Sequence, residues 1–375
     1  MSLVKKICQA IGLSGLFVLT ASQLVSCANL PSKQDAEAAP QAAAEQPVFK
    51  QQNLPNVELT EDLLYKLLLS DIASQQRNNE IALSTLVDAA TETRDPRLAA
   101  QATKQAVISA RYGTAIQMAR LWQELSPEDI DAYQTLGNLL VVKKKTGEAV
   151  TYYSKVLSLT DTSKHGTILE QISSTLVRYA SEEESMALIK QLEQDFPESA
   201  EVALARARIA SNYKQYTIAE EAVDHALALD PGSSDAAVLK FTLLLLQKKK
   251  QEAEAFAQAH LKINSDDTAL RTSLARHYLE SNKLKAADRE YSIIYEQDET
   301  SIIAPMALGL IRMDAGEMNE AAGYLERVLE LQPNNDMARI YLGDIANQQK
   351  RFDDAAQWYR AVTDSEQLFN ARLRL

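Results

Sequence analysis

The sequence predicts an all-α protein, a helical solenoid of about nine stacked helix pairs between residues 60 and 364. Three observations predict this fold class: a fixed repeat length, a leucine followed by a small residue early in each repeat, and apolar residues at helical spacing later in it. The repeat length is set by alanines that stand 34 residues apart, namely Ala219, Ala253, Ala287, Ala321 and Ala355. A period of this length is typical of a helical solenoid in which each unit is one helix pair.

The first helix of each unit is predicted to carry the small residue. This residue lies where the first helix contacts the second, and a larger side chain there would hold the two helices apart. The pairs stand thirteen and twelve residues before the repeated alanine: Leu136–Gly137, Leu274–Ala275, Leu308–Gly309 and Leu342–Gly343.

The second helix of each unit is predicted to bury a large residue four positions after the repeated alanine and an aliphatic one seven positions after it. These residues are Tyr153, Tyr291, Leu325 and Tyr359, followed by Val156, Ile294, Val328 and Val362. Several units end in a proline, namely Pro127, Pro231 and Pro333. Proline cannot continue the second helix, and it is tolerated at the start of the next helix.

These residues together resemble the tetratricopeptide repeat (TPR) family, and the resemblance implies the same solenoid of helical hairpins, wound into a right-handed superhelix. Looser copies are centred on Ala82, Ala115 and Ala149. The unit around Ala187 breaks the register, with intervals of 38 and 32 residues, and we expect it to be poorly formed. The stretch Glu366–Leu375 is predicted to start a tenth first helix, which is either a short capping helix or the point at which the repeat array is truncated. We expect truncation, because terminal repeats usually present a polar outer face and Phe369, Leu373 and Leu375 do not.

Residues 1–26 are predicted to be a lipoprotein signal peptide. Lys5 and Lys6 precede the apolar run Ile11–Leu19, which is too short to span a bilayer. The tetrad at 24–27, Leu-Val-Ser-Cys, resembles the bacterial lipobox, which implies that Cys27 is acylated, for example with palmitate, and becomes the first residue of the mature protein. The resemblance also implies the outer membrane, facing the periplasm, because Ala28 replaces the retention aspartate of Gram-negative lipoproteins. An ordinary signal peptide with a chance cysteine is the alternative.

Residues 27–58 are predicted to be the lipidated cysteine and a flexible linker, and residues 59–375 the solenoid. The linker is rich in Ala, Gln and Pro, and a chain of that length has a mean reach of about 30 Å. The other cysteine, Cys8, leaves with the signal peptide, so no disulfide is expected.

Composition and motifs exclude several classes of function. The net charge is −12 and becomes −14 when Lys5 and Lys6 are removed, which argues against nucleic acid and anionic headgroups as ligands. The four histidines, His165, His225, His260 and His277, show no metal-ligand spacing, and no nucleophile elbow or phosphate-binding loop occurs. We therefore expect no enzyme activity, no cofactor, no metal and no catalytic residue.

The runs Lys143–Lys145 and Lys248–Lys250 are expected to lie near first-helix ends, where cations offset the helix dipole.

A candidate partner groove follows from the TPR resemblance, which implies that the first helices line a concave face. Near the C-terminal end the groove positions are apolar, and they are Ile303, Met306, Leu310, Met313, Met337 and Ile340. Methionine-rich apolar surfaces can adapt to varied protein partners, so this patch is a candidate binding site. Arg208 and Arg276 are candidate ligands for a peptide carboxylate. The alternatives are that further repeats or the chain end bury the patch, and that the arginines are merely solvated.

The N-terminal units carry a second resemblance. Residues 59–68, 93–99 and 119–122 are similar to large proteobacterial TPR lipoproteins, among them the adaptor of a carboxyl-terminal processing protease. This resemblance implies an adaptor for periplasmic proteins, namely a processing protease and its cell-wall hydrolase substrates. The alternatives are a pilotin-like assembly factor for an outer-membrane secretin and a scaffold for envelope polysaccharide export. The sequence names neither the partner nor the oligomeric state.

Overall fold

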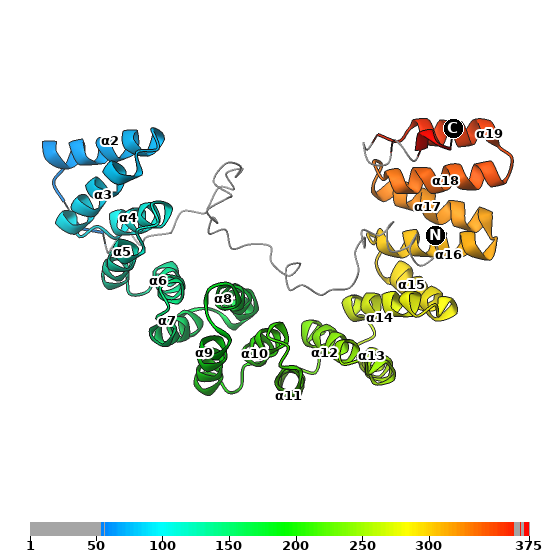
Figure 1. The fold of residues 1–375 in the computed structure, drawn as a ribbon, viewed down its shortest axis with the longest axis horizontal. Helices are drawn as coiled ribbons and strands as arrows, with labels where there is room; N and C mark the ends of the chain where they lie inside the picture. Colours follow the sequence, from blue (N-terminus) through cyan, green and yellow to red (C-terminus); the bar gives the residue numbers. More distant parts are fainter. Residues whose placement is uncertain (1–53, 56, 364–367, 369–370, 375) are drawn as a thin grey trace. The chain divides into compact units, whose positions relative to one another are not determined.

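The computed structural model describes residues 54–55, 57–363, 368 and 371–374. All regular secondary structure of these residues is helical, as predicted (Figure 1). They divide into two compact units, one ending at Pro231 and the other beginning at Gly232. The predicted signal peptide, Cys27 and most of the linker lie outside the described residues.

The unit that ends at Pro231 consists of five helix pairs. In each pair the two helices are joined by a short turn. The pairs are α2 (Glu61–Gln75) with α3 (Asn79–Thr93), α4 (Pro96–Ile108) with α5 (Tyr112–Leu125), α6 (Ile130–Val142) with α7 (Thr146–Leu159), α8 (His165–Tyr179) with α9 (Glu182–Asp195), and α10 (Ala200–Asn212) with α11 (Tyr216–Leu229). A short 3₁₀ helix, η3 (Thr162–Lys164), precedes α8.

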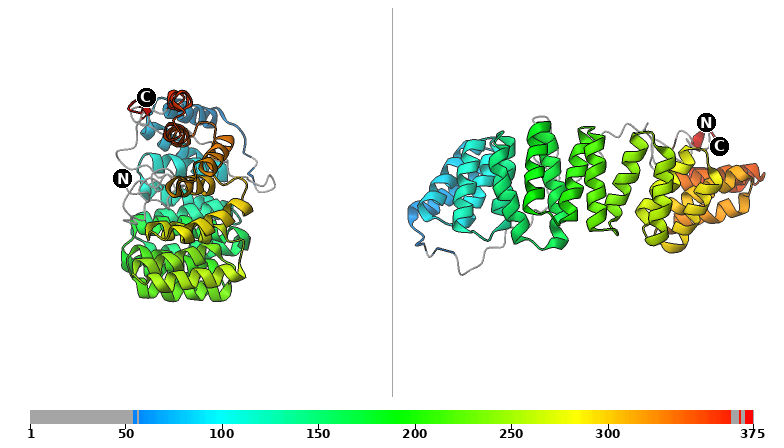
Figure 2. Two further views of the ribbon diagram at one scale, coloured as in Figure 1. Left: turned by 90° about the vertical axis from the view of Figure 1, so that its right-hand side faces the viewer. Right: turned by 90° about the horizontal axis from the view of Figure 1, so that it is seen from below.

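The unit that begins at Gly232 consists of four more pairs, whose helices lie side by side (Figure 2). They are α12 (Ser234–Leu246) with α13 (Lys250–Ile263), α14 (Thr268–Glu280) with α15 (Leu284–Gln297), α16 (Ile303–Ala315) with α17 (Met318–Leu331), and α18 (Asp336–Gln348) with α19 (Phe352–Arg360). The described residues therefore form nine pairs, the number that the period predicts. No helix in this part of the chain is long and apolar enough to cross a bilayer.

Side chains from the preceding loops cap the starts of most first helices. An Asn, Asp, Ser or Thr accepts a hydrogen bond from a backbone N–H of the first turn, which satisfies a donor that the helix itself leaves unpaired. Examples are Thr60, Asp129, Ser199 and Asp267. At α9, Ser181 and Glu184 form a reciprocal capping box, and Glu182–Glu184 occupy the first turn, where acidic side chains interact favourably with the helix dipole.

Each first helix except α8 ends in a turn that contains a left-handed residue, and in several pairs this residue is a lysine. Lys144 has φ of 61° and Lys248 has φ of 63°. In the first of these turns the N–H of Lys145 bonds to the carbonyl of Leu140 and the N–H of Lys144 to that of Val141, the pattern of a Schellman motif. The lysine runs thus lie at first-helix ends, as predicted. The Lys144 ammonium also donates to the carbonyl of Tyr179, the last residue of α8.

The predicted contact between small and large residues lies at the crossing of the helices in a pair. A Cβ atom added to Gly137 would lie 2.6 Å from Cε1 of Tyr153, and one added to Gly309 would lie 2.9 Å from Cγ of Leu325. The α12–α13 pair reverses the sizes: Phe241 occupies the small-residue position and Ala257 the large-residue position, and both are buried. Where the two helices of a pair cross, the sequence pattern therefore conserves the summed volume of the two facing side chains and does not require one residue type at either position.

The fourth pair corrects one detail of the predicted register. Ala187 is exposed, whereas Ser185 is fully buried at the position of the repeated alanine. Ser185 stands 36 residues after Ala149 and 34 before Ala219, so the irregularity is a two-residue insertion. It falls at the junction of α7 and α8, where η3 lies and where the ring Nε2 of His165 is 2.9 Å from the carbonyl oxygen of Leu157.

The insertion changes how the fourth pair packs. The helices α8 and α9 approach each other at few residues, whereas α9 packs closely against α7 and α10. The expectation that this unit is irregular is thus confirmed for its packing. The helices themselves are as long as those of the regular pairs.

Candidate protein-binding surfaces

The predicted partner groove lies on the first helices α14, α16 and α18 of the unit that begins at Gly232, apart from Arg208, which lies on α10. Asp267 and Asn335 cap the starts of α14 and α18 with their side chains. The small residues Ala275, Gly309 and Gly343 turn towards the second helices. The remaining positions of α16 and α18 hold the predicted apolar patch.

The structure buries three of the six apolar residues. Met306 and Leu310 are each 1% exposed and Ile340 is 2% exposed. Ile340 packs in a cluster that includes Tyr359, Val362 and Ala371, and every residue of α16 from Ala304 to Ile311 is buried. A helix that is apolar on all sides becomes enclosed. For these three residues the structure agrees with the alternative that the patch is buried.

The other three apolar residues of the patch remain accessible. Ile303 is 37% exposed, and Met313 and Met337 are half-buried. All three lie at or near the ends of α16 and α18. Binding of a partner at these positions stays a prediction.

The two candidate arginines are half-buried and lie in different units, Arg208 on α10 and Arg276 on α14. Burial raises the pKa of the Glu280 carboxyl, and the nearby charge of Arg276 opposes that shift. The Nε atom of Arg276 is buried and has no hydrogen-bond partner among the described residues. Capture of a peptide carboxylate by either arginine stays a prediction.

Two open cavities between α7 and α9 were missed by sequence reasoning. One, of about 720 Å³, is lined by residues that include Tyr152, Lys155 and Phe196. The other, of about 1010 Å³, is lined by residues that include Lys144, Glu183 and Asp195. Both lie where the two-residue insertion changes the packing of α9. The irregular interval in the sequence is the signal that points to this place, although it does not reveal a cavity.

Polar residues of these cavities are already engaged with one another. The hydroxyl of Ser154 donates to Oδ2 of Asp195 at 2.6 Å, and the ammonium of Lys145 lies 3.0 Å from Oε1 of Glu148. Such pairs on an exposed surface contribute little to stability. The cavities therefore present a surface of mixed charge.

Histidines and acids do not gather into a chemical site in the described part of the chain. No three His, Cys, Asp or Glu side chains there are placed to hold a metal ion. His260 and His277 are buried against single carboxylates, with Nε2 of His277 3.0 Å from Oε1 of Glu254 and Nε2 of His260 3.4 Å from Oδ2 of Asp267. Each pair joins neighbouring helices, as expected for core histidines.

Comparison with known families and proteins supports the repeat assignment. Residues 306–367 and residues 130–162 match models described as tetratricopeptide repeat. The TPR repeat-containing protein PA4667 of Pseudomonas aeruginosa is 32% identical over 99 residues. That match covers 26% of this chain and only 17% of the relative, so the chain spans a small part of that protein's length.

Several solved structures are similar at low identity. Yeast Tom70 is 13% identical with a TM-score of 0.39, and the match covers 84% of this chain and 95% of that one. MamA from Desulfovibrio magneticus RS-1 is 21% identical with a TM-score of 0.35, covering 45% and 96%. YrrB, described as a TPR protein with an unusual peptide-binding site, is 18% identical with a TM-score of 0.32, covering 58% and 93%. These two matched segments coincide with the α6–α7 pair and with most of the helices from α16 to α19.

Proposed function

We propose that the chain is a scaffold that binds periplasmic proteins and is held at the outer membrane of a Gram-negative bacterium by lipid on Cys27. The observation that carries the binding role is the series of helix pairs with tetratricopeptide repeats. Such a series shares its core between neighbouring pairs and leaves long rows of helix surface for partners. The partners that we infer are a carboxyl-terminal processing protease and its cell-wall hydrolase substrates, on the resemblance of residues 59–68, 93–99 and 119–122 to adaptors of this kind.

The partner groove is tested by capture from periplasmic extract, with residues 28–375 as bait and mass spectrometry to identify what is retained. The variant bait carries Met313→Glu and Met337→Glu, because these side chains are accessible and a charge there does not have to be buried. We expect the wild-type bait to retain a processing protease or cell-wall hydrolases and the variant to retain at least about tenfold less, the effect of losing roughly 1.4 kcal/mol of binding.

The matched control for the groove variant is Phe352→Glu, which places a charge at an exposed position of a second helix. This bait should retain the same proteins as the wild type. Equal capture by all three baits would show that the groove positions do not bind the retained proteins. Retention of secretin or polysaccharide-export components in place of a protease would contradict the adaptor role.

The anchor is tested by expressing the full chain and the Cys27→Ala variant in a Gram-negative host. We expect mass spectrometry to find acyl groups on the amino-terminal Cys27 of the mature protein, and fractionation to place it with the outer membrane. Each buried methylene contributes about 0.8 kcal/mol, so several acyl chains hold the protein firmly. The variant should appear in the soluble periplasmic fraction, and an unmodified Cys27 in the wild type would contradict the anchor.

A further inference from the structure

Arg276, on the first helix α14, is held partly inside the protein without an acceptor for its N–H groups. It is half-buried, its Nε atom is buried, and no hydrogen bond or ion pair joins it to another described residue. The other buried or half-buried arginines of the described residues are engaged. Ion pairs are formed by Arg206, Arg271, Arg312, Arg327 and Arg339, and Arg208 also has a partner. Arg276 thus differs from them in having donors that no described side chain satisfies.

The burial of Arg276 orients its guanidinium. The Nε atom is enclosed by protein, whereas the two terminal nitrogens, Nη1 and Nη2, are not enclosed. A planar guanidinium whose inner nitrogen is held in this way presents its two outer nitrogens as a fork. This fork matches the two oxygens of a carboxylate. Because the stem is already held, less side-chain freedom is lost when a carboxylate binds.

The neighbours of Arg276 along α14 do not compete for its outer nitrogens. Thr272 stands one turn earlier, and its hydroxyl donates to the carbonyl of Thr268 at 2.7 Å. Glu280 stands one turn later and interacts with the charge of Arg276 without forming an ion pair with it. The outer nitrogens of Arg276 are therefore the donors that this strip of α14 offers to another molecule.

An apolar strip of α12 lies beside Arg276. The helices α12 and α14 pack against each other (Figure 1). Each residue of the α14 strip has a counterpart 34 residues earlier on α12, and the counterparts are Val238, Thr242 and Leu246. All three are half-buried, and the hydroxyl of Thr242 donates to the carbonyl of Val238 at 2.8 Å. The α12 strip thus adds apolar contact next to the cation.

We propose that Arg276 binds the terminal carboxylate of a partner protein whose last residue is apolar, and that this last residue packs on Val238 and Leu246. The inference rests on the proposed role in binding periplasmic proteins. A chain end brings one negative charge, which one guanidinium balances. A segment with several acidic residues would be repelled by the net charge of −12 and locally by Glu280.

Fluorescence anisotropy with short labelled peptides and the purified full chain tests the proposal. The probe is a fluorescein-labelled peptide that ends in two leucines with a free carboxylate. We expect it to bind, and we expect the same peptide with a terminal carboxamide to bind at least about tenfold more weakly. A carboxamide peptide with one internal glutamate should bind no better than the plain carboxamide. A free-acid peptide that ends in two serines should bind more weakly than the leucine peptide, because it lacks the apolar contact with α12.

Substitutions of Arg276 assign the effect to this side chain. Arg276→Gln should lower the affinity for the free acid to that for the carboxamide and leave the carboxamide unchanged. Arg276→Lys keeps the charge and loses the fork, so its affinity for the free acid should lie between the two. The matched control is Arg289→Gln, which removes an exposed arginine of α15 and should bind both peptides as the wild type does. Circular dichroism should show the same helix content in all variants.

Several results would overturn the proposal. They are equal affinity of the wild type for the free acid and the carboxamide, no binding of the free acid up to about 1 mM, and equal effects of Arg276→Gln and Arg289→Gln. Binding of the internal-glutamate peptide as tightly as the free acid would overturn the assignment to a chain end. If an Arg276→Gln bait still captures periplasmic proteins while the free acid does not bind the wild type, the carboxylate site fails and the scaffold role stands.

Discussion

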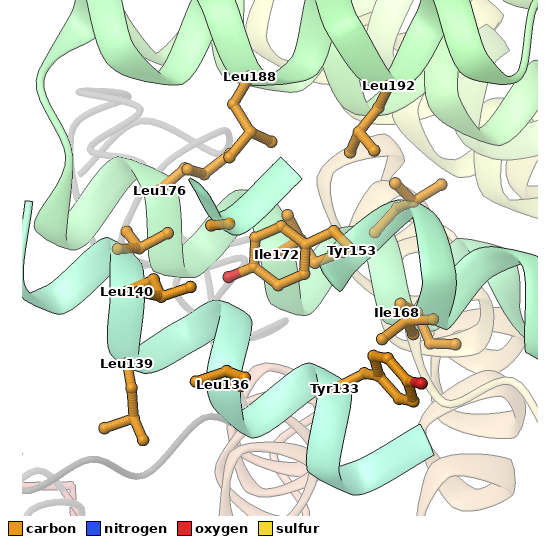
Figure 3. Close-up of a cluster of buried hydrophobic side chains, with 14 of the residues drawn as sticks. Tyr133, Leu136, Leu139, Leu140, Tyr153, Ile168, Ile172, Leu176, Leu188 and Leu192 are labelled. Atoms are coloured by element: carbon orange, nitrogen blue, oxygen red, sulfur yellow. The ribbon is translucent and has the colours of Figure 1, made fainter. Parts of the chain in front are cut away.

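Replacing Tyr153 with alanine is expected to lower the free energy of unfolding of the compact unit that ends at Pro231 by about 3–5 kcal/mol. This is the range for loss of a large buried aromatic side chain. Tyr153 is fully buried, and Figure 3 shows its ring amid side chains that include Leu136, Leu140 and Ile172. Removal of the ring leaves a cavity between two consecutive pairs, because the cluster joins α6 and α7 to α8 and α9.

The matched variant for this position is Tyr153→Phe, which keeps the ring and removes only the hydroxyl. That hydroxyl donates a hydrogen bond to Oδ1 of Asn138 at 2.8 Å, so its loss should cost about 1 kcal/mol. Hydrogen exchange of the α6 and α7 amides measures both variants locally, which matters because repeat arrays need not unfold in one step. Similar effects of the two variants would contradict the packing role of the ring.

Replacing Gly343 with alanine is expected to destabilise the last helix pair by about 1–3 kcal/mol, the usual range for overpacking. The added Cβ would lie 2.4 Å from Cε1 and 2.8 Å from Cδ1 of Tyr359, so α18 and α19 must move apart. The α14–α15 pair carries Ala275 and Tyr291 at the equivalent positions, so we expect a wider crossing and not complete unfolding. Thermal unfolding followed by circular dichroism measures the change.

The same chemical change at Gly323 should have the opposite sign. Gly323 lies in the middle of α17, where an added Cβ meets no atom within 4 Å. Alanine there should stabilise the helix by about 0.5–1 kcal/mol, because glycine loses more backbone freedom on folding. If Gly323→Ala and Gly343→Ala shift the midpoint in the same direction, the crossing is not the cause.

The sequence predicted the fold well because the repeat positions report contacts within a pair and between adjacent pairs. Gly137 faces Tyr153 and Gly309 faces Leu325, so their spacing reveals both helices and the crossing. The fourth pair was misaligned by two residues because Ala187 offered a small residue near the expected place. Only burial distinguishes exposed Ala187 from buried Ser185, and the hydroxyl of Ser185 bonds back to the carbonyl of Ser181.

The candidate groove was harder to predict because burial on a first helix depends on what covers it. Met306 and Met313 are the same residue type two turns apart, yet the first is buried and the second is half-exposed. A repeat position predicts burial only where another helix covers it.

Capture from periplasmic extract tests the central claim, binding of periplasmic proteins, most directly when the retained material is also assayed for proteolysis. We predict that the chain retains a processing protease. We also predict that this protease cleaves a cell-wall hydrolase faster when the purified chain is added. The Met313→Glu and Met337→Glu bait should lose both effects. Proteolysis that stays unchanged on addition of the chain, with no periplasmic protein retained, would contradict the claim.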